Sequence, residues 1–139
     1  MLYETSIKTT VVDKNGNDKT LVSRYIIENA ELFGEVEGKL YEEFGSMTGF
    51  EVLSIKISKL REIINERPQG DLECRIYFAT IVDRFYDGDK DETTETKYTV
   101  ALHAHNIDEA HKGIDQYMKQ GMEDMELVGL KCTKYISVL

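Results

Sequence analysis

The clearest structural signal in the chain begins with EVLSIKISKLREII, residues 51–64. A related stretch, ELVGLKCTKYISVL, fills residues 126–139, which lie 75 positions further along the chain. Three charged residues recur at that offset: Glu51 as Glu126, Lys56 as Lys131 and Lys59 as Lys134. Most of the other paired positions keep their apolar or polar character. A match of this length within one chain indicates an internal repeat.

Two shorter matches extend the repeat outward. They join residues 4–12 to 73–81 at an offset of 69, and residues 30–44 to 104–118 at an offset of 74. The change of offset predicts a five-residue insertion in the first loop of the second copy, because loops tolerate insertions. We therefore expect a single domain, 1–139, made of repeats 1–64 and 73–139. The linker between them, 65–72, holds the only proline of the chain.

Each repeat carries the same predicted elements, in the order strand, strand, helix, strand. The first two strands alternate apolar and polar residues around a hairpin dipeptide, Asn15-Gly16 or Asp87-Gly88. The helix follows from apolar residues spaced by four, which lie on one helical face. These residues are Val36, Leu40 and Phe44 in the first repeat, and Ala110, Ile114 and Met118 in the second.

A long last strand, with a bend near Ser58 or Thr133, closes each repeat. The fold class is therefore α+β, with tandem β-β-α-β repeats. One helix covering one face of an antiparallel sheet is the simplest packing for each repeat, and a pseudo-twofold axis relates the two. The sequence leaves open whether the repeats share one sheet or pack as two.

Several segments of the chain carry a resemblance to a known family. They are 73–76 (ECRI), 104–110 (AHNIDEA) and 126–128 (ELV), with 30–37 (AELFGEVE) as the counterpart in the first repeat. On these segments the chain resembles a family of short bacterial and phage proteins catalogued only as a domain of unknown function. The resemblance spans nearly the whole chain and supports the duplicated fold. It implies no activity.

The acidic composition limits the classes of partner that the protein is expected to bind. Lys and Arg number 17 against 26 Asp and Glu, a formal net charge of −9, whereas nucleic acids and anionic membranes attract clustered cations. No run of about 18 apolar residues predicts a membrane span, and the first residues do not form a signal peptide. Two cysteines are too few for a disulfide framework. We expect a cytoplasmic protein that binds neither nucleic acid nor membrane directly.

Candidate metal ligands fall short of a complete set. The acidic loop 87–95 begins like a calcium loop, but Glu92 stands where the turn needs glycine and Tyr98 where a bidentate glutamate is needed. His103 and His105 point to the same side of a strand, yet zinc takes three or four ligands. His111 lies on the predicted helix, and the cysteines belong to other strands. We therefore expect no metal and no cofactor.

The sequence also offers no catalytic motif. It lacks Gly-x-Ser-x-Gly and a glycine-rich phosphate loop. Cys74 and Cys132 occupy positions where the first repeat has Thr5 and Ile57, which suits packing better than nucleophilic catalysis. Enzymatic activity is not expected.

Strand alternation predicts which residues face away from the helices. If Ile76, Phe78, Val100 and Leu102 point at the helix, cations and aromatic residues gather on the other face of each sheet. The predicted ligand or partner face holds Arg75, Tyr77, His103, His105 and Lys131 in the second repeat, and Lys8, Tyr25 and Lys56 in the first. Three interpretations of this face stay open: an ordinary solvated surface, an interface between copies, or a pocket for an anionic small molecule.

The leading functional hypothesis is a non-catalytic interaction module that self-associates, in a bacterial or phage setting. Exposed faces and edges of small sheets suit contacts with a second copy or another protein. One alternative is sequestration of an anionic, nucleotide-like small molecule at the predicted face, as an anti-defence or signalling sponge. Another is an acidic inhibitor that mimics nucleic acid, supported only by the charge of −9.

Overall fold

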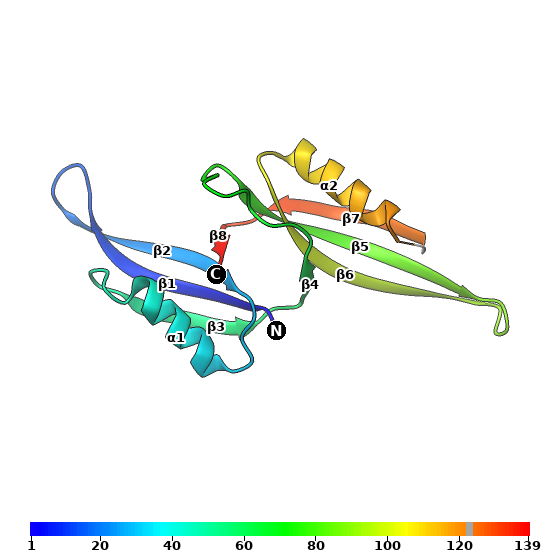
Figure 1. The fold of residues 1–139 in the computed structure, drawn as a ribbon, viewed down its shortest axis with the longest axis horizontal. Helices are drawn as coiled ribbons and strands as arrows, with labels where there is room; N and C mark the ends of the chain where they lie inside the picture. Colours follow the sequence, from blue (N-terminus) through cyan, green and yellow to red (C-terminus); the bar gives the residue numbers. More distant parts are fainter. Residues whose placement is uncertain (122–123) are drawn as a thin grey trace. The chain divides into compact units, whose positions relative to one another are not determined.

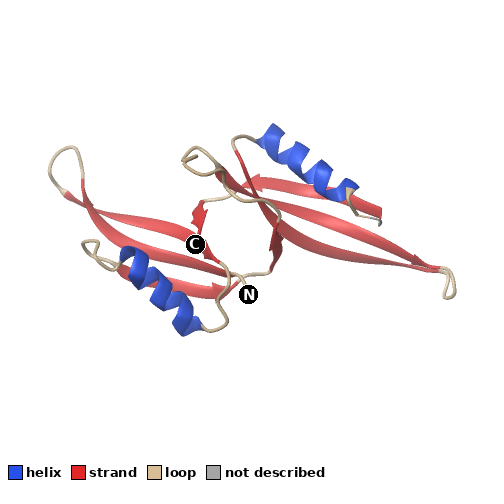
Figure 2. Ribbon diagram, in the orientation of Figure 1, coloured by secondary structure: helices blue, strands red, loops and turns tan. Residues whose placement is uncertain are grey.

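The protein has an α+β fold, seen in a computed structural model that describes residues 1–121 and 124–139 (Figures 1 and 2). The described residues form two helices and two mixed sheets of four strands each. The chain divides into two compact units, which we describe one at a time. Unit 1 comprises Met1–Lys59 and Lys134–Leu139, and unit 2 comprises Leu60–Thr133.

Unit 1 is a sheet with one helix on one face (Figure 1). Its elements are β1 (Tyr3–Val12), β2 (Asp18–Ile27), α1 (Phe33–Phe44), β3 (Glu51–Ile57) and β8 (Tyr135–Val138). The strands lie in the order β3-β1-β2-β8. Val36 and Leu40 of α1 are fully buried in a core with Tyr3, Ile7 and Ile27. The predicted spacing of four along this helix is confirmed.

Unit 2 is built in the same way. Its elements are β4 (Leu60–Ile63), β5 (Arg75–Asp87), β6 (Glu92–Ala104), α2 (Ile107–Lys119) and β7 (Asp124–Cys132). The strands lie in the order β4-β6-β5-β7. Ala110 and Ile114 of α2 pack into a core whose strand residues are Tyr77, Ala79, Ile81, Val100, Leu102 and Ala104.

The last strand of each half changes sheet. The chain leaves β3 at Ser58-Lys59 and continues as β4, which pairs with β6 of unit 2. It leaves β7 at Thr133-Lys134 and continues as β8, which pairs with β2 of unit 1. Both of these pairings are parallel, so the prediction of purely antiparallel sheets is wrong. The bends predicted near Ser58 and Thr133 are the points where the chain crosses.

Backbone hydrogen bonds at the two crossings correspond one to one. The Ser58 N–H donates to the Leu2 carbonyl at 2.8 Å, and the Thr133 N–H donates to the Ile76 carbonyl at 2.9 Å. Beyond each crossing, the Leu139 N–H donates to the Ile26 carbonyl at 2.8 Å, and the Ile64 N–H donates to the Ala101 carbonyl at 2.9 Å. The two exchanges therefore match. β4, which follows β3 of unit 1 along the chain, joins the sheet of unit 2, and β8, which follows β7 of unit 2, joins the sheet of unit 1.

The register corrects the predicted alignment of the first strands. β1 shifts against β3 between Ser6 and Ile7, and β5 shifts against β7 between Thr80 and Ile81. These bulges lie 74 positions apart, so the predicted offset of 69 and the five-residue insertion are wrong. The predicted alignment of β1 with β5 is therefore shifted by five residues. Because side chains alternate between the two faces of a strand, a shift by an odd number moves every side chain of β5 to the opposite face. This is why the predicted faces of β5 are inverted.

Candidate functional site

The predicted cationic face does not form a single surface in unit 2. Tyr77 pairs with Leu102 and is buried under α2, so its predicted place on the open face is wrong. Arg75 shares the helix side with Tyr77 by alternation and is exposed at the start of β5. Lys131 pairs with Phe78 and lies on the open face, as predicted. His103 also lies on the open face, but only 7% of it is exposed.

His105 is not a sheet residue at all. β6 ends at Ala104, and His105 lies in the short connection to α2. The strand periodicity that predicted His103 and His105 on one face therefore stops between them. His103 is held instead by Asn65: the His103 N–H donates to the Asn65 side-chain oxygen at 2.6 Å, and the Asn65 amide donates to the His103 carbonyl at 2.9 Å.

In unit 1 the prediction for two of three residues agrees with the register. Lys56 pairs with Glu4, and Lys8 pairs with Val22, on the sheet face opposite α1. The prediction that Tyr25 shares this face is wrong. Tyr25 pairs with the buried Thr5, and its ring lies 4.7 Å from that of Phe44 at the end of α1.

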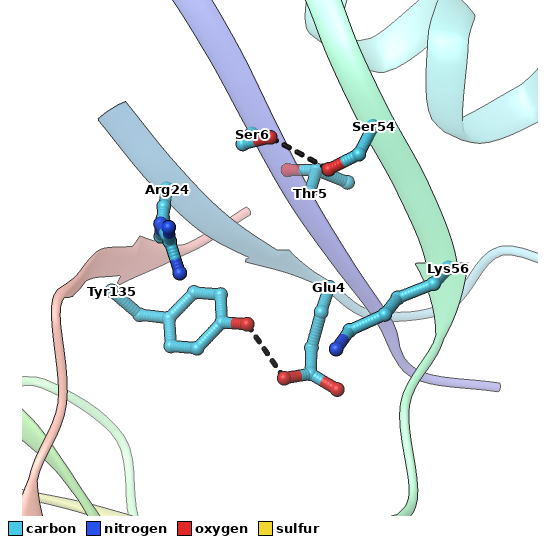
Figure 3. Close-up of a pocket in the computed structure, with 7 residues that line it drawn as sticks. All are labelled: Glu4, Thr5, Ser6, Arg24, Ser54, Lys56 and Tyr135. Atoms are coloured by element: carbon cyan, nitrogen blue, oxygen red, sulfur yellow. Dashed lines mark hydrogen bonds between the residues drawn. The ribbon is translucent and has the colours of Figure 1, made fainter. Parts of the chain in front are cut away.

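A polar pocket lies on this open face of unit 1, and Figure 3 shows its lining. The lining residues are Glu4, Thr5, Ser6, Arg24, Ser54, Lys56 and Tyr135, and the volume is about 160 Å³. They come from four neighbouring strands because Glu4 pairs with Lys56, Ser6 pairs with both Ser54 and Arg24, and Arg24 pairs with Tyr135. The exchanged strand β8 therefore supplies one wall of the pocket.

Two hydrogen bonds organise the pocket. The Tyr135 hydroxyl donates to Glu4 Oε1 at 2.6 Å, and the Ser6 and Ser54 hydroxyls lie 2.6 Å apart (Figure 3). Burial raises the pKa of Tyr135 well above its ordinary value, and the Glu4 carboxylate raises it further. The tyrosine thus remains a neutral hydrogen-bond donor, and one oxygen of Glu4 is occupied.

Arg24 and Lys56, the two cations that line the pocket, differ in their ion pairing from Lys8 on the same sheet face. Lys8 forms an ion pair with Glu51 at 2.9 Å. Among residues 1–121 and 124–139, neither Arg24 nor Lys56 has a carboxylate within ion-pair distance. The pocket therefore presents two cations and several hydroxyls around one carboxylate that a tyrosine already binds. Such a set suits an anionic group.

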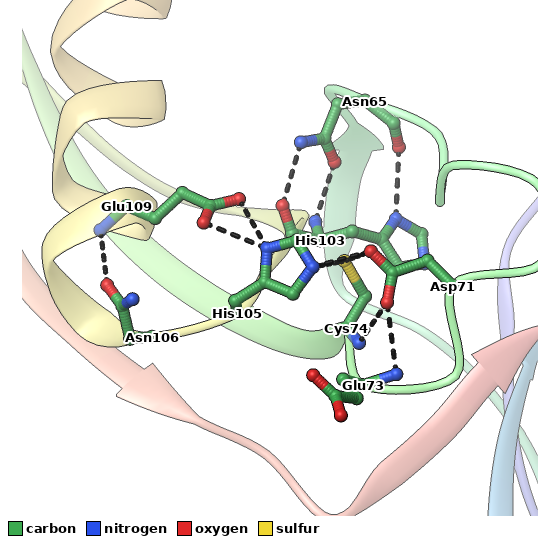
Figure 4. A network of polar contacts seen from close by, with 8 residues as sticks. All are labelled: Asn65, Asp71, Glu73, Cys74, His103, His105, Asn106 and Glu109. Atoms are coloured by element: carbon green, nitrogen blue, oxygen red, sulfur yellow. Dashed lines mark hydrogen bonds and ion pairs between the residues drawn. The ribbon is translucent and has the colours of Figure 1, made fainter.

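A second polar cluster lies in unit 2, near the start of β5 (Figure 4). His105 Nε2 lies 2.5 Å from Asp71 Oδ2 and 3.6 Å from the thiol of Cys74, while His105 Nδ1 lies 2.9 Å from Glu109 Oε2. Hydrogen bonds to Glu109, and next to Asp71, raise the pKa of His105. The hydrogen bond from His105 is the main cause that lowers the pKa of Asp71, and burial raises the pKa of Cys74.

This cluster is poorly arranged for nucleophilic catalysis by Cys74. A catalytic histidine needs a neutral nitrogen that faces the nucleophile and can accept its proton. Here carboxylates contact both nitrogens of His105, which favours the imidazolium form. Asp71, Cys74 and His105 do, however, offer three atoms that could ligate a metal ion, all within 4.8 Å of one another.

Comparisons with known proteins place the whole chain in one family. The model of a domain of unknown function, DUF4494, matches residues 1–139. The chain belongs to the DUF4494 family. No curated protein and no solved structure shows a significant match to it. The predicted resemblance to a family of unknown function is thereby confirmed.

The predicted ligand or partner face of this DUF4494 chain includes Lys56, which lines the pocket, and His105, which belongs to the cluster. It does not include Arg24, Glu4, Tyr135 or Asp71. A hairpin register would have joined two of the residues: Arg75 pairs with Ala104, so Cys74 and His105 are the next residues outward on each strand. The strand exchange that brings Tyr135 beside Glu4 has no comparable local signal.

Among residues 1–121 and 124–139, neither helix has the length and hydropathy that a membrane-spanning helix requires.

Proposed function

We propose that this DUF4494 protein is a non-catalytic binding module that takes an anionic group of a small molecule in the pocket of unit 1. The observation that carries the proposal is the convergence of Arg24 and Lys56, which lack ion-pair partners among the described residues, on a pocket lined with hydroxyls. Unpaired cations that share a concave polar site favour an anion as the missing partner.

The chemistry of the lining favours a phosphate-like group. The Arg24 guanidinium can donate two parallel hydrogen bonds to neighbouring anionic oxygens, and Lys56 adds a mobile point charge. Ser6 and Ser54 supply hydroxyls that can turn toward an oxygen of the ligand. The charge of Glu4 opposes an anion, but the Tyr135 hydroxyl already binds this carboxylate. Two cations against one carboxylate leave an excess of positive charge.

The size of the pocket limits what it encloses. Sites for drug-sized ligands run from about 300 to 1,000 Å³, whereas this one measures about 160 Å³. We therefore expect it to hold one phosphate or carboxylate group while the remainder of a nucleotide-like molecule extends over the sheet. This is the sequestration function that the sequence raised as an alternative, with its location moved to unit 1.

Calorimetric titration of the full chain with inorganic phosphate and with a nucleoside diphosphate tests the proposal. Arg24→Gln and Lys56→Gln should each weaken binding about tenfold, the order expected for loss of one charge-assisted contact. The matched control is Lys8→Gln, on the same sheet face but paired with Glu51, and it should leave affinity within about twofold. Two results would refute the proposal. One is an affinity of the Arg24→Gln/Lys56→Gln double variant equal to that of wild type, and the other is no binding by wild type at millimolar ligand.

Self-association is a second candidate function, supported by the edges of the sheets. β3 is an edge strand of unit 1, and Leu53 and Ile57 on it are 45% and 48% exposed. An edge strand with apolar side chains can pair with another copy. Leu53→Lys should convert an associated form into monomer in light scattering after gel filtration. A monomeric wild-type chain at high micromolar concentration would rule this candidate out.

We propose that the two halves arose by duplication of one β-β-α-β unit, which the matching hydrogen bonds at the crossings support. We propose that this is a bacterial or phage protein that acts in the cytoplasm. Both Cys74 and Cys132 are free thiols, which suits a reducing compartment.

A further inference from the structure

We propose that Asp71, Cys74 and His105 of unit 2 form a zinc-binding site. Asp71 comes from the connection before β5, Cys74 from the residue just before that strand, and His105 from the residue just after β6 (Figure 4). They provide one oxygen, one sulfur and one nitrogen ligand. The inference concerns a different unit from the pocket, so it does not depend on the proposed function.

The distances fit a tetrahedral metal ion. With Zn–S near 2.3 Å and Zn–N or Zn–O near 2.0–2.2 Å, the sulfur of a tetrahedral site lies roughly 3.5–3.6 Å from its neighbouring ligands. Cys74 Sγ lies 3.6 Å from His105 Nε2 and 3.5 Å from Asp71 Oδ2. The remaining pair, His105 and Asp71, share a hydrogen bond of 2.5 Å. Only that pair must separate, by about 1 Å, when the metal replaces the shared proton.

Each ligand is also oriented by a supporting contact. Glu109 holds His105 Nδ1 at 2.9 Å, which leaves Nε2 for the metal. Carboxylate support of a ligating histidine is a common feature of zinc sites. The other oxygen of Asp71 accepts the N–H groups of Glu73 and Cys74 at 3.0 and 3.2 Å, which leaves Oδ2 facing the histidine.

The helix start fixes this arrangement. Asn106 caps α2, because its side chain accepts the Glu109 N–H at 2.8 Å. The cap places Glu109 in the first turn, where its carboxylate reaches back to His105. The carboxylate that supports His105 therefore comes from the first turn of α2.

The ligand types select zinc. A mixed set of thiolate, imidazole and carboxylate suits Zn²⁺, whereas Ca²⁺ and Mg²⁺ take oxygen ligands. Three protein ligands leave a fourth position for water or an added anion. The side chain of His105 is 40% exposed, so that position is accessible from solvent. The proposal departs from the expectation of no metal, which rested on placing the cysteines away from the histidines.

Zinc titration of the full chain, stripped with a chelator and kept reduced, tests the site. We expect one zinc ion per chain with a Kd of about 1 μM or tighter, and a rise in Tm at excess zinc. Cys74→Ser and His105→Gln should each weaken binding at least about 100-fold, and Glu109→Gln about 10- to 100-fold. Cobalt should give a thiolate-to-metal absorption band that Cys74→Ser abolishes.

The chain supplies matched controls. Cys132 is the other free cysteine and is exposed on β7, and His111 lies on the surface of α2 beside Asp115. Cys132→Ser and His111→Gln should bind zinc within about twofold of wild type, since neither residue adjoins the site. If the buried Cys74→Ser fails to fold, His105→Gln decides, because its side chain is partly exposed. Unchanged zinc affinity in His105→Gln, or a Kd weaker than about 100 μM in wild type, overturns the site.

Discussion

One hydroxyl group joins strands that are far apart in the sequence. Tyr135 and Glu4 are 131 positions apart, and their hydrogen bond connects the exchanged strand β8 to the central strand β1. The bond is partly shielded and involves a charged acceptor, which makes it stronger than a bond between neutral groups. At the scale of the residue, Tyr135 both shapes the pocket and anchors the exchange.

Tyr135→Phe should therefore lower the free energy of unfolding by about 1 kcal/mol at pH 7, a value reduced for partial exposure. The pKa of Tyr135 is raised above 10.0 in the folded chain, by burial first and then by Glu4. Above pH 10 the tyrosine ionises in the unfolded chain before it does in the folded chain, so the wild type loses its advantage as pH rises. Urea midpoints of both proteins at pH 7 and pH 10.5 measure the difference.

Tyr41→Phe serves as the control for this experiment. Tyr41 is 55% exposed on α1, so its substitution should change stability little at either pH. A difference between wild type and Tyr135→Phe that stays constant across this pH range would contradict the described environment of Tyr135.

At the scale of the element, the helices were the most predictable part. Apolar residues spaced by four identify a buried helical face without knowledge of the rest of the chain. Gly45 is the C-cap residue of α1. The side chain of Asn106 caps the start of α2, whereas Leu32, the N-cap residue of α1, makes no side-chain cap. Helix ends depend on side-chain geometry that spacing does not encode.

Strand faces were harder to predict than helices. A strand of alternating residues such as β5 carries apolar side chains on both faces, with Ile76 buried on one and Tyr77 on the other. Alternation alone then cannot identify the face that meets the helix. Lys56, which was assigned to the predicted ligand or partner face, lies on the open face of its sheet, and Lys131, 75 positions further on, lies at the corresponding register of unit 2. Arg24 has no such counterpart.

Two glycines should respond in opposite ways to alanine. Gly38 lies in α1 with open space where the Cβ of an alanine would stand, so Gly38→Ala should stabilise the chain by about 0.5–1 kcal/mol. Gly49 has φ +67°, and a Cβ there would overlap the side chain of Thr10. Gly49→Ala should destabilise by about 1–3 kcal/mol. Urea unfolding followed by circular dichroism measures both changes in stability. Equal effects of the two substitutions would disprove the described surroundings of Gly38 and Gly49.

At the scale of the whole molecule, the exchange makes the two units unequal. Unit 2 is one continuous segment, Leu60–Thr133, whereas unit 1 needs two segments separated by all of unit 2. The Leu139 N–H and carbonyl bond Ile26 and Glu28, so the final segment completes the edge of the unit 1 sheet. Sequence could not reveal this, because strand pairing across such a separation is decided by tertiary packing.

Fragments that correspond to the two units should differ in their ability to fold alone. Residues 60–133 should fold alone, whereas residues 1–59 should not, because β2 then lacks its neighbour β8. Joining 1–59 to 134–139 through about ten Gly/Ser residues should restore folding, since such a linker spans roughly 17 Å and three strand spacings measure about 14 Å. Amide dispersion in NMR spectra reports each outcome. Cooperative folding of 1–59 without the added segment would show that β8 is dispensable.

The crossing of β8 into the first sheet also sets the order of events during synthesis. β1, β2, α1 and β3 leave the ribosome early, yet their sheet stays incomplete until residues 135–138 have been translated. Unit 2 has all of its strands once residue 132 has emerged. The half made first is therefore finished last, and its open edge beside β2 is exposed to other nascent chains in the interval.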